Sequence, residues 1–326
     1  MNLKIYAPAR LVYASSETEI PLVSIIIPTY RRESMLKEAL TSALLQDTKA
    51  PIEIIVVDND PESAASILAK VPHQQSRHQL RYYVNSANIG MFGNWNQGLS
   101  LAKGRWLSFL HDDDWLAPQF VSDMLPLMQD GVEFAVCQVK AGNLSYEPGI
   151  LPRRRDSDSV SFLTIDDLVY TNPSPAPGLL LSREKLIDIG GFDPDTYPSG
   201  DYLTYTRCAR SVISVRLNRT LAYYRMSDSQ TFKGNTLQLM IEQSDRIKRE
   251  LLSNAQKLST ITYVLSMACW FRIAREHATD LSLLKFDWRL KIALAISRVQ
   301  PLLRVAKGVR LLIKFLIRKE WKPSRS

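Results

Sequence analysis

Residues 23–58 read VSIIIPTYRRESMLKEALTSALLQDTKAPIEIIVVD, and this stretch decides the fold. Its two ends, VSIIIP and IEIIVVD, are β-branched runs without polar alternation, as is typical of strands buried on both faces. Between them, apolar residues recur on one face of a helix: Leu36, Leu40, Ala43 and Leu44. The stretch therefore predicts two parallel strands joined by a helix.

The alternation of strand and helix patterns continues through the first 130 residues. We expect a helix over 62–70, a strand over 80–84, a helix near 94–102 and a strand over 106–110. Alternation of this kind is typical of an α/β fold with a parallel, doubly wound sheet. Ligands of such sheets bind beyond the carboxyl ends of the strands.

Polar residues follow three of the predicted strands. Residues 106–118, WLSFLHDDDWLAP, end an apolar run in three adjacent aspartates, while Thr29 and Asp58 stand at the carboxyl ends of the two strands of the opening stretch. Adjacent carboxylates repel one another and are costly to desolvate. Mn²⁺ or Mg²⁺ would explain the cluster, because hard cations prefer carboxylate oxygens. The alternative is a solvated turn after a strand.

The segment 132–234 is of mixed character. It predicts a strand over 132–139, a polar loop over 145–159, an extended segment over 172–178, a strand and short helix over 179–193, a helix over 201–210 and a hairpin over 214–226. From residue 235 the pattern is helical. We therefore expect two domains, 1–234 and 235–326.

Composition places the chain among globular proteins, with 45% hydrophobic and 23% charged residues. Its three cysteines are far apart, which favours a reducing cytosol over a disulfide framework or a zinc site. The amino-terminal residues lack the apolar core of a signal peptide, and no window of about 18 residues is apolar enough for a transmembrane span.

The net charge of +8 is concentrated in residues 298–326, which hold nine lysines and arginines and one glutamate. The rest of the chain is close to neutral, which argues against a nucleic-acid partner. Within residues 302–317, basic side chains share one helix face beside an apolar one: Arg304, Lys307, Arg310 and Lys314. This pattern predicts a helix in the membrane interface and a cytoplasmic, peripheral enzyme. The alternative is a bundle helix with solvated charges.

Four motifs in order resemble the family 2 glycosyltransferases of the GT-A fold, a Rossmann-like fold with a mostly parallel central sheet. The resemblance covers roughly residues 20–232 and leaves a C-terminal helical extension outside it. The motifs are VSIIIPTYRR (23–32), IEIIVVDND (52–60), NIGMFGNWNQGLSLAKGRWLSFLHDDDWLAP (88–118) and GGFDPDTYPSGDYLTYTR (190–207).

The resemblance implies a function in cell-surface polysaccharide synthesis. A sugar would pass from a nucleotide diphosphate sugar to a hydroxyl of a glycan or lipid-linked acceptor, with inversion and with Mn²⁺ or Mg²⁺ as cofactor. The family's roles match the following positions: Pro28, Thr29 and Tyr30 border the nucleotide, Asp58 binds the base, Asp112 lies near the ribose, Asp113 holds the metal and Asp201 is the general base.

The sequence departs from the family pattern at two positions. His111 stands where an aspartate is common, and Tyr224-Arg225 is followed by Met226 and Ser227 rather than by a histidine. The second departure removes an expected contact to the diphosphate or metal. Both keep open an alternative function, a catalytically lapsed, membrane-associated scaffold of the same fold.

Several of these residues also have a structural interpretation. Asp201 is a candidate helix N-cap, and Asp58 is a candidate strand-end turn residue. We expect His73 and His78 to be solvated and Trp95 and Trp115 to lie in the core. His111 lies beside the expected site and has no assigned role. The run Arg153–Arg155 is either solvated or meets an anionic acceptor.

Two other enzyme classes fit less well. A nucleotidyltransferase should carry a glycine-rich loop after its first strand, whereas this chain has PTYRR there. A glycosidase needs two carboxylates flanking one bond, and no acid partner is evident.

Overall fold

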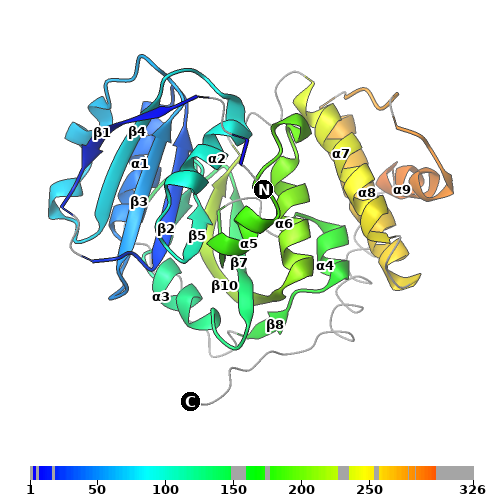
Figure 1. Ribbon diagram of the computed structural model, residues 1–326. Helices are drawn as coiled ribbons and strands as arrows, with labels where there is room; N and C mark the ends of the chain where they lie inside the picture. Colours follow the sequence, from blue (N-terminus) through cyan, green and yellow to red (C-terminus); the bar gives the residue numbers. More distant parts are fainter. Residues whose placement is uncertain are drawn as a thin grey trace. The chain divides into compact units, whose positions relative to one another are not determined.

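The computed structural model describes residues 3–4, 7–16, 19–147, 159–172, 177–226, 235–252, 257–277, 279–282 and 284–298 (Figure 1). These residues form two compact units. The larger contains the residues described up to 161 together with 177–226, and the smaller contains 162–172 and the residues described from 235 onward. The division into domains at residue 234 stays a prediction.

The described strands of the larger unit form one ten-stranded sheet. Its first part consists of the parallel strands β4 (Gln79–Asn85), β3 (Ile52–Asp58), β2 (Val23–Thr29) and β5 (Trp106–Phe109), with β1 (Ala9–Ala14) antiparallel at the edge. Every residue of β2 and β3 is buried, as expected of strands covered on both faces. The opening stretch is therefore the centre of the parallel region.

The sheet continues from β5 through β9 (Leu179–Ser182), β7 (Val132–Gly142) and β10 (Ile213–Arg225) to β6 (Trp115–Leu116), and β8 (Val160–Phe162) pairs with β10. Strand β9 is antiparallel to both neighbours, whereas β10 runs parallel to β7. The fold is thus α/β with a mostly parallel central sheet, as the sequence predicts.

Two sequence predictions of local structure are wrong. Residues 214–226 form no hairpin, because β10 runs through them as one strand that pairs with β7 and absorbs the polar middle as register shifts. Residues 62–70 form only a 3₁₀ turn at Ser66–Lys70, because Ala65 has a left-handed backbone with φ +54°. A right-handed helix cannot pass through that conformation.

Helices cover both faces of the parallel strands. The apolar face of α1 (Glu33–Leu44) belongs to the core cluster that contains Ile25 and Ile27, and α2 (Gly90–Leu101) packs on the side to which Ile26 points. A Cβ at Gly98 would lie 2.4 Å from the Ile26 Cγ2 atom, so only glycine allows this approach. The remaining helices of this unit are α3 (Phe120–Met124), α5 (Arg183–Asp188) and α6 (Gly200–Ser211).

The smaller unit is helical in the described residues. It contains α4 (Ile165–Tyr170), α7 (Thr236–Leu252), α8 (Lys257–Glu276) and α9 (Trp288–Arg298). The buried Lys248 Nζ donates to Ser266 Oγ at 2.6 Å, and Ser266 Oγ donates to the Tyr170 carbonyl at 2.5 Å, so polar contacts tie α7, α8 and α4 together. None of the described helices combines the length and apolarity needed to cross a bilayer. The amphipathic stretch 302–317 lies outside the described residues.

Candidate active site

The carboxyl ends of three neighbouring strands bring the polar residues of the sequence motifs together. The pairing of β2 with β3 sets Thr29 opposite Asp58, and the Leu110 amide donates to the Ile26 carbonyl, which continues β5 alongside β2. Thr29 Oγ1 donates to Asp112 Oδ2 at 2.8 Å. Three segments that are distant in sequence therefore meet at one rim.

A cavity of about 320 Å³ opens at this rim. Thr29, Asp58 and Tyr82 contribute polar groups to its wall, and Arg32 lines it at the start of α1. The remaining lining residues are Arg31, Glu33, Leu36, Asp60, Ser63, Ala64, Ala65, Ser66 and Ile67. Its volume lies in the range of small-molecule sites, about 300–1,000 Å³.

Asp58 is held in place by two hydrogen bonds. Its carboxylate accepts from the Tyr82 hydroxyl at 2.7 Å and from the Asp60 amide at 3.0 Å. Burial, together with the Asp58 charge, raises the pKa of Tyr82, so the tyrosine keeps its proton and donates it. The contact with the Asp60 amide is the one expected if Asp58 is a strand-end turn residue. The Asp58 side chain also lines the cavity.

The other two residues of the first motif lie differently. Pro28 is buried in β2 opposite Val57 and is not among the residues that line the cavity. Tyr30 is 39% exposed, and the Arg31 guanidinium lies 5.1 Å from the centre of its ring. Of the three nucleotide candidates of that motif, Thr29 alone lines this cavity.

An asparagine network, which the sequence analysis did not single out, fixes the end of β3. Asn59 Oδ1 accepts from Asn85 Nδ2 and from the Ile89 amide, both at 3.0 Å. Asn59 Nδ2 donates to Asn88 Oδ1 at 2.8 Å, and Asn94 Nδ2 donates to the Val57 carbonyl at 2.9 Å. In the sequence, this network was signalled by asparagines that stand at the ends of two adjacent parallel strands.

Arg32 joins the first two aspartates of the cluster. Its Nη1 atom donates to Asp112 Oδ1 at 3.0 Å and to Asp113 Oδ2 at 2.7 Å. Burial and the neighbouring Asp113 charge raise the pKa of Asp112, while Arg32 and Thr29 oppose this rise. The cation therefore favours the charged form of a buried carboxylate that would otherwise tend to take up a proton.

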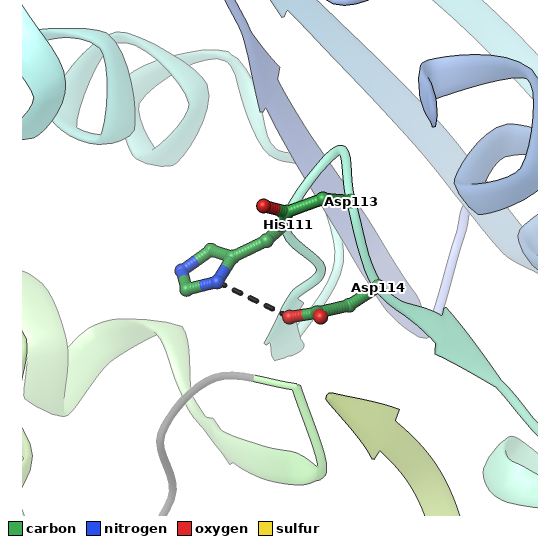
Figure 2. A group of neighbouring side chains, drawn as sticks. All are labelled: His111, Asp113 and Asp114. Carbon is green, nitrogen blue, oxygen red and sulfur yellow. Dashed lines mark ion pairs between the residues drawn. The ribbon is translucent and has the colours of Figure 1, made fainter. Parts of the chain in front are cut away.

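His111 and the third aspartate form an ion pair. His111 Nδ1 lies 3.2 Å from Asp114 Oδ2 (Figure 2), and the Arg225 amide donates to Asp114 Oδ1 at 2.8 Å. Burial raises the pKa of Asp114 to about 7 although His111 opposes this. Burial would lower the pKa of His111, but Asp114 and the charges of Asp113 and Asp201 raise it to about 9. The ion pair therefore favours the charged form of each partner.

His111, Asp113 and Asp114 could hold a metal ion. Each offers one ligand atom, and these atoms lie within 4.8 Å of one another. Two carboxylate oxygens and one imidazole nitrogen form a donor set that suits Mn²⁺ and also accepts Mg²⁺. From the sequence, the metal was expected on Asp113 alone and His111 had no role, although the place of His111 at the head of the acidic motif was a signal.

Asp201 lies in the first turn of α6, and the helix N-cap is Ser199. The N-cap interpretation of Asp201 is therefore wrong. A carboxylate in the first turn is still favoured by the helix dipole. The charge of Asp201 contributes to the raised pKa of His111, which places this carboxylate near the start of the aspartate motif.

Two expectations about the surrounding side chains have different outcomes. Trp95 and Trp115 are core residues as predicted: Trp95 stacks on Phe109 and Trp115 on Tyr223. His78, however, is buried rather than solvated, because its Nε2 atom bonds the Gln46 carbonyl at 2.8 Å beside β4, and burial lowers its pKa. Arg153–Arg155 and Ser227 lie outside the described residues.

The sequence model of glycosyl transferase family 2 matches residues 24–187, half of the chain. The chain belongs to this family. The matched region begins in β2, contains the aspartate cluster and ends within α5. It ends before Asp201.

Curated relatives of this family member include a protein of Campylobacter jejuni named GalNAc(5)-diNAcBac-PP-undecaprenol beta-1,3-glucosyltransferase. It is 35% identical over 133 residues, which cover 39% of this chain and 42% of that protein. The uncharacterized glycosyltransferase MJ1057 of Methanocaldococcus jannaschii is 30% identical over 193 residues, which cover 59% and 66%. The chain thus spans less than two thirds of the length of these relatives.

Solved structures share the fold. Staphylococcus aureus TarS 1–349 in complex with UDP-GlcNAc superposes with a TM-score of 0.55 at 16% identity, covering 89% of this chain and 91% of that one. The mannosyltransferase PcManGT from Pyrobaculum calidifontis in complex with GDP-Man and Mn²⁺ gives 0.54 at 14%, covering 97% and 91%. These likenesses confirm the GT-A fold with helices at its carboxyl-terminal end.

Proposed function

We propose that this protein transfers a sugar from a nucleotide diphosphate sugar to a hydroxyl of a glycan or lipid-linked acceptor in cell-surface polysaccharide synthesis, with inversion at the anomeric carbon. One observation carries the proposal. The 320 Å³ cavity that contains Thr29 and Asp58 adjoins the aspartate cluster, because Thr29 and Arg32 touch both. A nucleotide in the cavity would therefore place its diphosphate beside the carboxylates.

The base and ribose would bind at the ends of β2 and β3. Asp58 presents a carboxylate fixed by Tyr82, which suits the N–H of a nucleobase. Asp112 is fixed by Thr29 and Arg32, which suits a ribose hydroxyl. The binding energy of both groups holds the donor in one orientation while the sugar is transferred.

The leaving diphosphate needs positive charge as its bond to the sugar breaks. Asp113, together with His111 and Asp114, would hold Mn²⁺ or Mg²⁺, which stabilises that developing charge when bound. Arg32 supplies a positive charge at the same place on the cavity wall. The Mn²⁺ in the PcManGT complex supports the choice of metal.

The acceptor needs a base. We assign this role to Asp201, whose carboxylate would take the proton of the acceptor hydroxyl as that oxygen attacks the anomeric carbon. The attack forms the new glycosidic bond while the bond to the diphosphate breaks, so the configuration inverts. The lipid diphosphate in the name of the Campylobacter relative supports a lipid-linked acceptor.

A nucleotide panel tests the donor site. UDP, GDP and their sugars are added to the full chain with and without Mn²⁺, and the melting temperature is recorded. A ligand at 100 times its Kd should stabilise the protein by about 2.7 kcal/mol. We expect one base to be preferred, and we expect Asp58→Ala to lose the shift while Asp188→Ala, an exposed carboxylate on α5, keeps it. The proposal is contradicted if no nucleotide raises the melting temperature of the full chain.

We also propose that the protein is cytoplasmic and binds the inner face of the membrane. Helix α9 exposes Trp288 (58%) and Ile292 (45%), one turn apart, and the exposed basic residues Lys291 and Arg298 lie on the same helix. Aromatic and aliphatic side chains beside cations suit an anionic bilayer surface. The segment 298–326, which holds the nine clustered lysines and arginines, begins at the last residue of α9.

Deletion of residues 298–326 is expected to abolish sedimentation with anionic liposomes while the nucleotide-induced thermal shift remains. The reason is that each basic residue near an anionic leaflet contributes about 1 kcal/mol. Neutral liposomes and a salt series are the controls, because screening should weaken the charge term. If the full chain ignores anionic liposomes at low salt, the charges of the tail are merely solvated.

A further inference from the structure

Arg32 occupies the place of a cation in the acidic cluster. A single nitrogen, Nη1, lies within hydrogen-bond distance of two different carboxylates, Asp112 at 3.0 Å and Asp113 at 2.7 Å. The two carboxylates are mostly buried and adjacent in sequence, so without a positive charge between them they would repel each other. Arg32 therefore offsets part of the negative charge of Asp112 and Asp113.

This contact competes with a bound metal ion. Asp113 is also one of the three residues whose ligand atoms lie together, and its Oδ2 atom is the one that Arg32 contacts. Two cations that share a carboxylate repel each other, and the repulsion is large where water is scarce. A metal ion therefore binds more weakly while Arg32 stays on Asp113.

Arg32 has an alternative partner within reach. It lines the 320 Å³ cavity as well as the cluster, and its side chain is 22% exposed, so it is not locked in the core. A diphosphate in that cavity would offer oxygens that suit the planar guanidinium. This step rests on the proposed function.

We propose that Arg32 is a positioning residue that serves as the counter-ion of Asp112 and Asp113 in the free protein and moves toward the diphosphate when the nucleotide binds. Metal and nucleotide then bind cooperatively, because the nucleotide removes the cation that opposes the metal. Cooperativity is reciprocal, so the metal also strengthens nucleotide binding.

The chain offers a matched control at the next position. Arg31 lines the same cavity and carries the same charge, but it pairs with Asp60 at 2.9 Å and its side chain is 61% exposed. Arg31→Gln removes one positive charge from the neighbourhood without touching Asp112 or Asp113. It therefore separates a local effect of Arg32 from a general change of electrostatic potential.

The experiment measures Mn²⁺ binding to the full chain by the electron paramagnetic resonance signal of free Mn²⁺, with and without UDP or GDP. Without nucleotide, we expect Arg32→Gln to bind Mn²⁺ about tenfold more tightly than the unchanged protein, and Arg31→Gln to stay within about twofold. The gain in Mn²⁺ affinity on adding nucleotide should shrink in Arg32→Gln. Arg32→Lys, which keeps the charge, should restore weak binding in a folded protein.

The proposal is overturned if Arg32→Gln, folded by circular dichroism, binds Mn²⁺ no more tightly than the unchanged protein, or if neither protein binds it. Binding by Arg32→Gln alone would support the proposal. A different result would contradict the proposed function: neither UDP nor GDP would bind the unchanged protein. The nucleotide-free comparison tests the counter-ion in either case.

Discussion

Asp113→Ala is expected to lower sugar transfer at least about 10³-fold, which corresponds to about 4 kcal/mol of transition-state stabilisation. Asp113 accepts a hydrogen bond from Arg32 and belongs to the group of candidate metal ligands. If Asp113 holds the metal as proposed, its removal would take away a contact that strengthens as charge develops on the leaving diphosphate. The measurement is the steady-state rate of transfer from the donor that the nucleotide panel identifies, with saturating Mn²⁺.

Asp195→Ala is the control for this loss. Asp195 is an aspartate of the same unit, but its side chain is 83% exposed and its carboxylate pairs with Lys4 at the surface. Surface ion pairs of this kind contribute about 0–1 kcal/mol, so transfer should be unchanged. Near-normal activity of Asp113→Ala with Mn²⁺ present would show that Asp113 is not a metal ligand. Nucleotide binding without any transfer by the unchanged protein would favour the catalytically lapsed scaffold.

Asp201→Asn is expected to lower kcat by roughly 10²–10⁴-fold and to leave donor affinity nearly unchanged. Asparagine keeps the size of the side chain and its place in the first turn of α6, but it cannot take a proton. A loss confined to kcat is the sign of an interaction made in the transition state. Pre-steady-state transfer and donor titration of the same preparation separate the two quantities.

A structural role of Asp201 would give a different result. If the carboxylate served only the helix dipole, the substitution would lower thermal stability by about 0.3–1 kcal/mol and leave kcat close to normal. Equal losses of donor affinity and kcat would instead place Asp201 in the donor site. Asp195→Asn, an exposed carboxylate shortly before α6, is the matched control.

The sequence by itself determined the parallel core of this protein. The β-branched runs of β2 and β3 and the apolar face of α1 are local patterns, and burial on both faces of a strand is visible in the residues themselves. Because parallel strands end at one edge, the same pattern also predicted that Thr29, Asp58 and the aspartates would meet. Family resemblance supplied the roles that these residues are expected to have.

Only the tertiary structure decided which side chains pair at that edge. Arg32 bridges Asp112 and Asp113 from the start of α1, and the amide of Arg225, at the end of β10, holds Asp114. Such contacts join residues about 80 to 110 positions apart, and no local pattern encodes them. The burial of His78 and the single strand β10 are similar cases. Each depends on a neighbouring strand or turn that supplies hydrogen-bond partners, and those partners are fixed only when the chain has folded.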